Sequence, residues 1–293
     1  LEEITVTSTR SGRSVKNTPT RVEVIAEDEV HEEATMRPGD IRMLLSESTG
    51  IQTQQTSATS ANASIRIKGL DGRYTQILKD GFPAYSGAAN GLGLLQTPPL
   101  DLKQVEIIKG SSSTLYGGGA VAGLINLITK LPTEKREFNF HINGTSAGGV
   151  DINSFYGERF KKTGVTFFVS RNSNKAFDPA KISFSAIPKF ERYTFNPKLF
   201  LYFTEKTKLN FGINTTFENR LGGDIKLIEG NGDNIPSYFE LYTTTRFSTQ
   251  FTLNHQRTKH NRHTFQKSKS SSNIFIESHN YSFSGRQFSS FSY

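Results

Sequence analysis

The chain has 293 residues, a formal net charge of +8, and neither cysteine nor tryptophan. The absence of cysteine excludes disulfide frameworks and thiolate metal sites, and it fits an envelope protein that folds without bridges. No apolar run approaches the roughly 18 residues that a transmembrane helix needs. The scattered basic charge is compatible with nucleic acid, an anionic membrane face or an anionic substrate. The sequence starts at Leu1 without an initiator Met or a signal peptide, so we expect a mature or trimmed start.

The N-terminal segment is short and β-prone, because Ile4 and Val6 alternate with Thr5 and Thr7. A lone strand of this kind is unstable in water unless another sheet edge accepts it. From the residues alone, an ordinary first strand of the domain that follows is the better interpretation.

Residues 11–50 combine a polar linker, a strand and a helical region. Alternation predicts a strand at Arg21–Ile25, and apolar spacing predicts helix over Asp28–Ser48. Asp40 is placed to cap a helix, and Gly50 ends this region.

Two loops enclose the next pair of predicted strands. Residues 52–63 are low-complexity and polar, and residues 84–93 are small residues around one aromatic side chain, so both read as solvated loops. The elements between them are a strand at Ser64–Gly69, a turn at Asp71-Gly72, a returning strand at Gln76–Leu78, a second turn at Asp80-Gly81, and Pro83.

The stretch Val105–Lys130 is the most informative part of the chain. It opens with the apolar run Val105–Ile108 and closes with the apolar run Leu124–Thr129, which is too short for a capped helix. Gly117–Gly119 remove Cβ atoms where the backbone must turn tightly or approach another backbone. The pattern predicts two buried strands that flank a glycine-rich turn.

This stretch resembles the end of the plug domain of TonB-dependent outer-membrane receptors, whose pattern is roughly I-E-V-x-R-G-P-x-S-x-L-Y-G-x-x-A-x-x-G-x-I-N-I-x-T. The matching residues here are Glu106, Gly110, Ser113, Leu115, Tyr116, Gly117, Ala120, Gly123, Ile125, Asn126 and Thr129. An earlier part of the pattern, I-R-G followed by L-x-D-G-x-P, is matched by Ile67, Gly69, Leu78, Asp80, Gly81 and Pro83. Lys68 and Lys109 stand where the family has arginine, and Ser111 where it has proline. Lysine cannot form the bidentate fork that arginine makes with a carboxylate, so we expect weaker ion pairs at both lysines, including any between plug and wall.

The resemblance implies functional roles for three groups of residues. The N-terminal segment would be the Ton box, which pairs by strand addition with the periplasmic protein TonB through Glu3, Ile4, Thr5, Val6 and Thr7. The plug apices would contact the ligand through Gln54, Gln55, Thr56, Ser57, Tyr85, Ser86 and Asn90. The structural motif of the plug would comprise Lys68, Gly69, Asp80, Gly81, Glu106, Lys109, Gly110, Tyr116, Gly117, Gly123 and Asn126.

After Pro132 the sequence changes to strands that alternate polar and apolar residues. The candidate strands are Glu137–Asn143, Ile152–Phe160, Val165–Val169, Tyr193–Phe203, Leu209–Ile213, Phe247–Leu253 and the region Phe265–Ser290. Pro197 is awkward within its strand, because proline suits edges and bulges. Short turns at Lys161–Gly164 and Glu205–Thr207 alternate with long loops at Asn172–Arg192 and Phe217–Pro236, as in outer-membrane barrels.

The alternation predicts apolar side chains toward lipid and polar ones toward a wet interior. A soluble sandwich would show the same alternation, and the recurrence of Phe and Tyr at strand ends favours the membrane barrel. By strand parity, Gln256–Arg262 is a periplasmic turn. His255, His260 and His263 lie near it, but without a carboxylate or thiolate a solvated basic turn is the better interpretation than a metal site.

The predicted fold is a small α+β plug domain followed by an antiparallel all-β membrane barrel that is partial in this chain. Residues 1–12 would form the Ton box and linker, residues 13–133 the plug, and residues 134–293 the N-terminal part of the barrel. The barrel part has roughly eight candidate strands, whereas a plugged lumen needs about 22. We therefore expect the N-terminal part of a longer receptor in the Gram-negative outer membrane.

The sequence is compatible with three functions. The first is a TonB-energised receptor for a ferric siderophore or similar iron chelate, with cobalamin, haem or glycan as alternative ligands. Its partners would be TonB, the ligand and outer-membrane lipid, without nucleic acid, cofactor or metal. The second is a passive pore or binding protein of the same architecture. The third is an enzyme, which is disfavoured because Gly117-x-Gly119-x-x-Ala122 lacks the strand, helix and acidic residue of a dinucleotide site.

Overall fold

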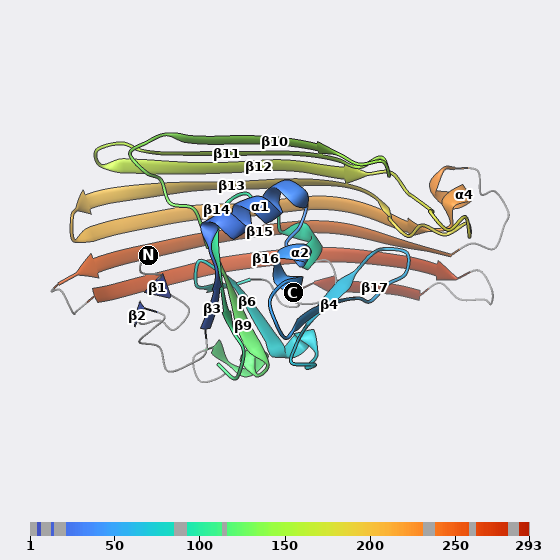
Figure 1. Cartoon of the computed structure of the whole chain (residues 1–293), viewed down its shortest axis with the longest axis horizontal. Coiled ribbons are helices and arrows are strands. Elements are labelled where there is room, and N and C mark those ends of the chain that lie inside the picture. The colour runs from blue at the N-terminus through green and yellow to red at the C-terminus, as the bar shows by residue number, and fades with distance from the viewer. Residues whose placement is uncertain are drawn as a thin grey trace. The chain divides into compact units, whose positions relative to one another are not determined.

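The structure is a computed structural model that describes residues 5–6, 13–14, 22–84, 93–112, 116–230, 238–257, 262–280 and 287–292. The chain divides into two compact units. The first comprises Leu1–Thr56 and Asn62–Lys130, and the second comprises Ser57–Ala61 and Leu131–Tyr293. Figure 1 labels the elements of both, and each unit is described by itself.

A five-stranded mixed sheet forms the centre of the first unit, in the order β3-β8-β9-β6-β7. Its strands are β3 (Val22–Ile25), β6 (Thr75–Lys79), β7 (Phe82–Pro83), β8 (Leu102–Ile108) and β9 (Gly123–Thr129). β8 and β9 are antiparallel and almost wholly buried, which confirms the two buried strands predicted around the glycine-rich turn. β9 pairs on its other side with β6 in parallel. Short 3-10 turns lie at Gly72–Tyr74, Leu94–Gln96 and Gly118–Ala120.

Two helices, α1 (Glu27–Met36) and α2 (Arg42–Ser46), replace the single helical region predicted over residues 28–48. Pro38 and Gly39 separate them, because proline lacks the N–H that a continuous helix requires. The N-cap of α2 is Ile41, so Asp40 lies one residue before the capping position that was predicted for it. Its carboxylate still accepts a hydrogen bond from the backbone N–H of Arg42, the first residue of the helix, at 3.0 Å. Burial alone would raise the pKa of Asp40, but Arg42 and Arg37 together hold that pKa below its usual value.

The polar stretch after Gly50 is not a loop throughout. Residues Ile51–Gln55 form β4, which pairs with β5 (Ala63–Ile67) in a separate two-stranded sheet. The expected hairpin across Asp71-Gly72 is also wrong, since β5 pairs with β4 while β6 pairs with β9 and β7. The chain does turn there, and the Asp71 carboxylate accepts from the N–H of Arg73 at 3.0 Å.

The N-terminal strand β1 (Thr5–Val6) pairs only with β2 (Arg13–Ser14) among the described residues. It takes no place in the five-stranded sheet of the first unit. The interpretation of this segment as an ordinary first strand of that sheet is therefore wrong.

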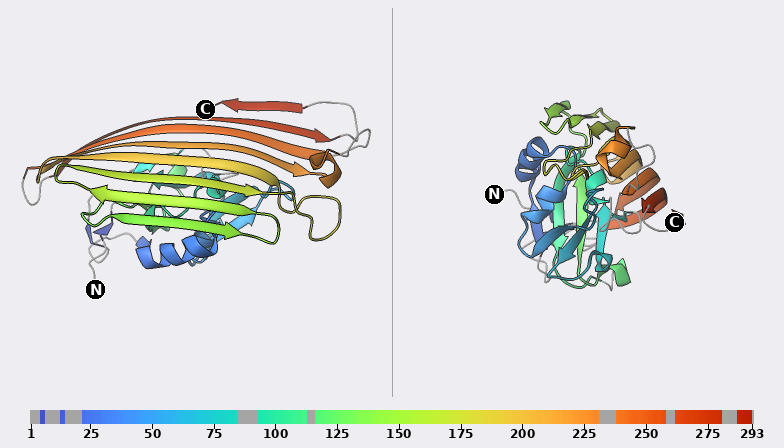
Figure 2. Two further views of the ribbon diagram at one scale, coloured as in Figure 1. Left: turned by 90° about the horizontal axis from the view of Figure 1, so that it is seen from above. Right: turned by 90° about the vertical axis from the view of Figure 1, so that its right-hand side faces the viewer.

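The second unit contains an eight-stranded antiparallel sheet in which each strand pairs with its neighbours in the sequence. Its strands are β10 (Glu137–Gly144), β11 (Val150–Arg159), β12 (Thr163–Asn174), β13 (Lys189–Thr204), β14 (Thr207–Gly223), β15 (Tyr238–Gln256), β16 (Arg262–Asn280) and β17 (Gln287–Ser292). Figure 1 shows the long strands side by side, and Figure 2 shows that the sheet curves across its width. A short helix, α4 (Ile225–Ile228), lies in the connection after β14.

The two faces of this sheet differ in chemistry. Phe138, Phe140 and Phe211 are 62%, 57% and 40% exposed, so these aromatic side chains do not form a core. The opposite face carries buried polar side chains such as Asn153 and Asn172. The predicted sense of the alternation, apolar outward and polar inward, is confirmed.

Pro197 lies in β13, in the middle of the sheet and not at an edge. Its Cα partner on β12 is Phe167, whereas the pairing with β14 skips Asn196 and Pro197 and resumes in the same register. Proline has no N–H to donate, so the interruption is local and does not shift the strands.

The connections alternate in length as predicted. Residues 160–162 and 205–206 join strands at one end, while residues 175–188 and 224–237 join them at the other. No helix in the described part of the chain combines the length and apolar character that would let it cross a membrane.

The substitution Gly123→Ala tests the packing of β8 against β9. A Cβ at Gly123 would lie 2.5 Å from the carbonyl oxygen of Ile108 and 2.7 Å from Cδ1 of Ile67. We expect destabilisation of the first unit by about 1–3 kcal/mol, the usual cost of overpacking. The measurement is the urea midpoint for protease cleavage within residues 22–130 of the purified protein. Gly118→Ala is the control, because nothing lies within 4 Å of that position; equal midpoints for the two variants would contradict the argument.

Candidate functional site

The Asp80-Gly81 turn is fixed by side chains and backbone of β9. Both residues have left-handed backbone angles, with φ of 54° and 80°. Asp80 accepts hydrogen bonds from the backbone N–H and the hydroxyl of Thr129, each at 2.9 Å, and its own N–H donates to the carbonyl of Leu127. The Gly81 N–H donates to Oδ1 of Asn126 at 3.0 Å. The turn thus holds the β6–β7 hairpin against the end of β9.

Glu106 and Asn126 continue these contacts into the interior of the first unit. Both side chains are fully buried, and Nδ2 of Asn126 donates to Oε2 of Glu106 at 3.4 Å. The amide of Gln104 donates to the other carboxylate oxygen at 3.0 Å. A buried carboxylate is costly unless hydrogen bonds satisfy it, so Glu106 ties β8 to β9.

The two lysines that replace arginine bind locally within the first unit. The ammonium of Lys109 contacts the carboxylate of Glu23 on β3 and the carbonyl of Thr49. Ser48 donates to the other oxygen of Glu23, and Lys68 donates to the carbonyl of Lys109 at 3.2 Å. Lys109 therefore meets its carboxylate with one nitrogen atom, as expected for lysine in place of arginine.

The remaining signature residues shape the backbone between β8 and β9. Gly110 and Gly117 have φ of 154° and 81°, which L side chains rarely adopt. Tyr116 is half-buried and packs against a cluster formed by Leu78, Ile108 and Leu124. The hydrogen bonds and packing contacts given above for the described motif residues all lie within the first unit.

The segment Ser57–Ala61, here called the anchored loop, lies in the sequence between β4 and β5 but belongs to the second unit. Ser57 donates to Glu240 on β15 at 2.8 Å, and its hydroxyl accepts from the N–H of Ser60. The Thr59 carbonyl accepts from Ser185 at 3.1 Å, and the Ser60 carbonyl accepts from Arg220 at 3.1 Å. Backbone groups of this loop are therefore held by side chains of the eight-stranded unit.

Close approach at Gly222 completes this anchor. A Cβ at that position would lie 2.3 Å from the carbonyl oxygen of Thr59. Ser185 also accepts from the N–H of Gly223 at 2.9 Å, so one hydroxyl joins the β14 end to the loop. Ser185, Arg220, Gly222 and Glu240 were not singled out from the sequence. The adjacent glycines at 222–223 were the only visible signal.

A row of polar side chains crosses the inward face of four neighbouring strands. Asp151, Asn172, Arg192 and Glu218 are successive partners in the strand register. Asn172 donates to Asp151 at 2.8 Å, Arg192 donates to Asn172 at 2.9 Å, and Arg192 approaches Glu218 at 3.4 Å. Arg220 donates to the same Glu218 carboxylate at 2.7 Å, which makes the row continuous with the anchored loop.

The expected ligand-contacting residues fall into three situations. Gln54, Gln55 and Thr56 are exposed at the end of β4, whereas the hydroxyl of Ser57 is engaged in the anchor. Tyr85, Ser86 and Asn90 lie outside the described residues. Of the expected Ton box, Thr5 and Val6 form β1, and Glu3, Ile4 and Thr7 lie outside the described residues.

Within the described ranges, no three His, Cys, Asp or Glu side chains gather in a way that could hold a metal ion. His260, one of the three histidines considered from the sequence, lies outside those ranges. The acidic and basic groups of both networks hold backbone or one another.

Comparison with known proteins agrees with this architecture. Residues 14–124 match the TonB-dependent receptor plug domain. The chain is 27% identical over 136 residues to the vitamin B12 transporter BtuB of Vibrio cholerae serotype O1, covering 46% of this chain and 22% of that protein. It is 30% identical over 149 residues to an iron-regulated outer membrane virulence protein of Vibrio cholerae, covering 48% and 22%. It is 31% identical over 131 residues to the rhizobactin receptor of Rhizobium meliloti, covering 44% and 17%.

The fold also matches a solved structure, the siderophore receptor PiuA from Acinetobacter baumannii. The TM-score is 0.67 at 14% identity, covering 94% of this chain and 40% of that one. A likeness at that identity shows the fold alone. The segment of this chain that matches each sequence relative covers only about a fifth of that relative's length. The share is 22% for the vitamin B12 transporter and 22% for the iron-regulated protein.

The chain is thus similar to TonB-dependent receptors, because residues 14–124 match their plug domain and the fold of the chain matches that of a solved siderophore receptor. The iron-regulated relative is named as an outer membrane protein.

A single engineered cysteine can report whether the anchored loop is held, because the chain has none of its own. Ser60 is fully buried, so we expect Ser60→Cys to react slowly with a maleimide. Adding Gly222→Val forces the Thr59 carbonyl away and should raise the labelling rate at least tenfold. Gly144→Val is the control, since nothing lies within 4 Å of Gly144. An unchanged rate in the Gly222→Val background would show that the loop is not held there.

Proposed function

We propose that the protein carrying this chain imports a ferric siderophore or a similar iron chelate across the outer membrane, with energy delivered by TonB. The observation that carries the proposal is the position of β1. This strand pairs only with β2 among the described residues and stays outside the five-stranded sheet. A short β-prone segment that the sheet does not use is available for strand addition to another protein.

We assign the parts of the chain as follows. Residues 1–12 are the Ton box and linker, with Glu3, Ile4, Thr5, Val6 and Thr7 as the residues that pair with TonB. Residues 13–133 are the plug, and residues 134–293 are the first part of the barrel. The transport cycle requires no chemical step, which fits relatives that are named as transporters and receptors.

The ligand would bind at the plug apices. Gln54, Gln55 and Thr56 are exposed beside the anchored loop, and we assign the second apex to Tyr85, Ser86 and Asn90. Ser57 acts as a positioning residue in this proposal, because its hydroxyl fixes the loop through Glu240.

An iron chelate is favoured because the names of two relatives refer to iron regulation and to rhizobactin. The net charge of +8 also suits an anionic ligand. Cobalamin is the second candidate, since another relative is named as a vitamin B12 transporter. Haem, glycans and a passive pore of the same architecture are the remaining alternatives.

Deletion of residues 3–7 tests the energy coupling. We expect uptake of the ligand to fall at least tenfold while its affinity for whole cells stays unchanged, because the plug apices are intact. Val6→Pro should have the same effect, since proline cannot donate to a strand pairing, and Thr9→Pro is the matched control outside the proposed segment. Uptake that survives the deletion, or that persists after a protonophore collapses the proton gradient, would favour the passive pore.

Growth of a deletion strain identifies the ligand class. We expect the strain to fail under iron limitation with iron supplied as a hydroxamate or catecholate chelate, and to grow normally when cobalamin is limiting. Complementation with the intact gene should restore growth, and the variant lacking residues 3–7 should not. Failure under cobalamin limitation alone would instead support the second candidate.

A further inference from the structure

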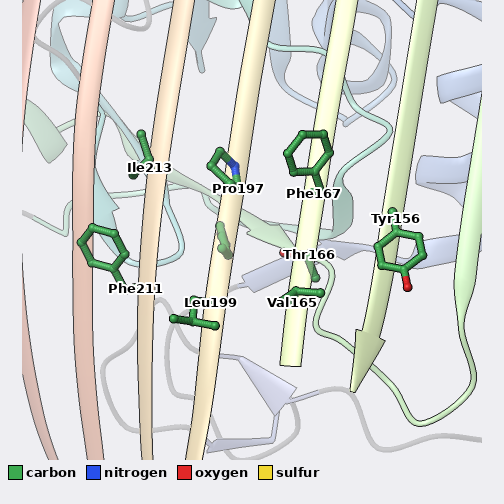
Figure 3. A pocket seen from close by; sticks show the side chains of 9 residues that line it. Tyr156, Val165, Thr166, Phe167, Pro197, Leu199, Phe211 and Ile213 are labelled. Carbon is green, nitrogen blue, oxygen red and sulfur yellow. The ribbon is translucent and has the colours of Figure 1, made fainter. Parts of the chain in front are cut away.

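The outward face of the second unit carries an apolar groove near the end where the turns are short. It has a volume of about 500 Å³ and is lined by Val165, Phe167, Pro197, Leu199, Phe211 and Ile213. Figure 3 shows these side chains on three neighbouring strands, with Tyr156 beside them on the next strand. These strands are β12, β13 and β14.

The strand register explains why a groove forms at this place. Val165, Leu199 and Phe211 occupy one rung, and Phe167 and Pro197 occupy the next rung but one. The compact ring of Pro197 lies between Phe167 and Ile213 and offers less bulk than either (Figure 3). Phe167 stacks edge-on against Phe195 at a centroid distance of 4.9 Å, which holds its ring to one side. The groove is therefore a fixed depression in the apolar face.

The short turns beside the groove are basic. Val165 lies two residues from the start of β12 at Thr163, and Phe211 lies four residues from the start of β14 at Thr207. Among the described turn residues at this end, the cations Lys161, Lys162, Lys206 and Arg257 outnumber the single carboxylate, Glu205.

The opposite end of the sheet shows no such excess. The described residues of its connections, 145–149, 175–188 and 224–230, carry three lysines and three carboxylates. Exposed aromatic side chains lie at the level of the basic turns, since Phe160, in the turn at 160–162, is 52% exposed and Phe203, near the end of β13, is 56% exposed. Such residues are typical of the boundary between the apolar layer and the headgroups.

We propose that the groove and the basic turns together form a binding site for one anionic phospholipid of the inner leaflet. Leu199 lies five residues before the end of β13 at Thr204, which is about 16 Å along a strand. An acyl chain in the groove thus places its phosphate at the level of Lys161, Lys162 and Lys206. These lysines supply the charge that the headgroup requires.

The position of the groove near the short turns favours an anionic phospholipid over lipopolysaccharide as its occupant. Short turns face the periplasm in outer-membrane barrels and long loops face the exterior. The inner leaflet is built of phospholipids, and lipopolysaccharide is confined to the outer leaflet, beside the loops whose charges balance. The site requires only the outer-membrane location and is independent of the ligand that the receptor transports.

The test measures phospholipid retained by the protein purified from outer membranes in a mild detergent. Extracted lipid is quantified per mole of protein by mass spectrometry, and binding is repeated in phosphatidylcholine nanodiscs that contain a minority of phosphatidylglycerol. Lys161→Gln, Lys162→Gln and Lys206→Gln are combined in one variant. We expect it to retain roughly tenfold less phosphatidylglycerol and cardiolipin, because each lysine near a membrane surface contributes to anionic lipid binding.

Two further variants separate the groove from the general apolar face. Val165→Phe fills the groove and should lower retention of the same lipids, whereas Val169→Phe adds an equal ring elsewhere on the outward face and should not. The control for charge combines Lys175→Gln, Lys181→Gln and Lys226→Gln at the opposite end. Heat-modifiable migration in gels verifies that each barrel is folded.

Several outcomes would overturn the proposal. Equal retention by the Lys161, Lys162 and Lys206 variant and by its charge control would do so. The proposal would also be overturned if the native protein retained no anionic phospholipid. It would be overturned equally if the molecule released by Val165→Phe were lipopolysaccharide or a second protein.

Discussion

The first unit depends on one carboxylate that has no access to water. Glu106 is fully buried, and an uncompensated charge in such a place costs several kcal/mol or shifts to the neutral form. The chain compensates it with the amides of Asn126 and Gln104. Asn126 in turn uses its carbonyl oxygen to receive the N–H of Gly81. One buried group is therefore connected through hydrogen bonds to β8, to β9 and to the turn after β6.

In the second unit the difficulty is not a buried charge but exposed apolar side chains, which need an apolar environment in place of water. Its polar groups gather on the inward face, where Asp151, Asn172, Arg192 and Glu218 satisfy one another across four strands. Neighbouring members of the row share partners, so removing one of them disturbs the bonds of the next, and the row constrains the strands as a set. The backbone hydrogen bonds and this row of polar side chains fix the register of the strands. The outward face takes no part in this, so its side chains can be apolar.

Features encoded locally could be predicted from the sequence. The β8–β9 pair, the Asp80-Gly81 turn and the alternating strands are encoded within a few residues, as side-chain period or backbone preference. β4 could not be predicted, because the polar residues after Ile51 form a strand only through pairing with β5. The anchor is long-range as well: Ser57 and Glu240 are 183 residues apart, and no local pattern links them. Pro197 is awkward by the preference of proline for edges and bulges, yet it lies inside β13, because a long strand tolerates a local interruption of its ladder.

The anchored loop lies in the sequence between two strands of the first unit, although its residues belong to the second unit. Thr56 donates to Asn62 across the base of the β4–β5 hairpin, and the five residues between them are held by the second unit. Any displacement of that hairpin must stretch the loop or break the bonds from Ser57, Ser185 and Arg220. A net hydrogen bond contributes about 0.5–1.5 kcal/mol, and about 1.5–3 kcal/mol where one group is charged, as in the bonds to Glu240 and from Arg220. These few bonds together are enough to keep the loop in place.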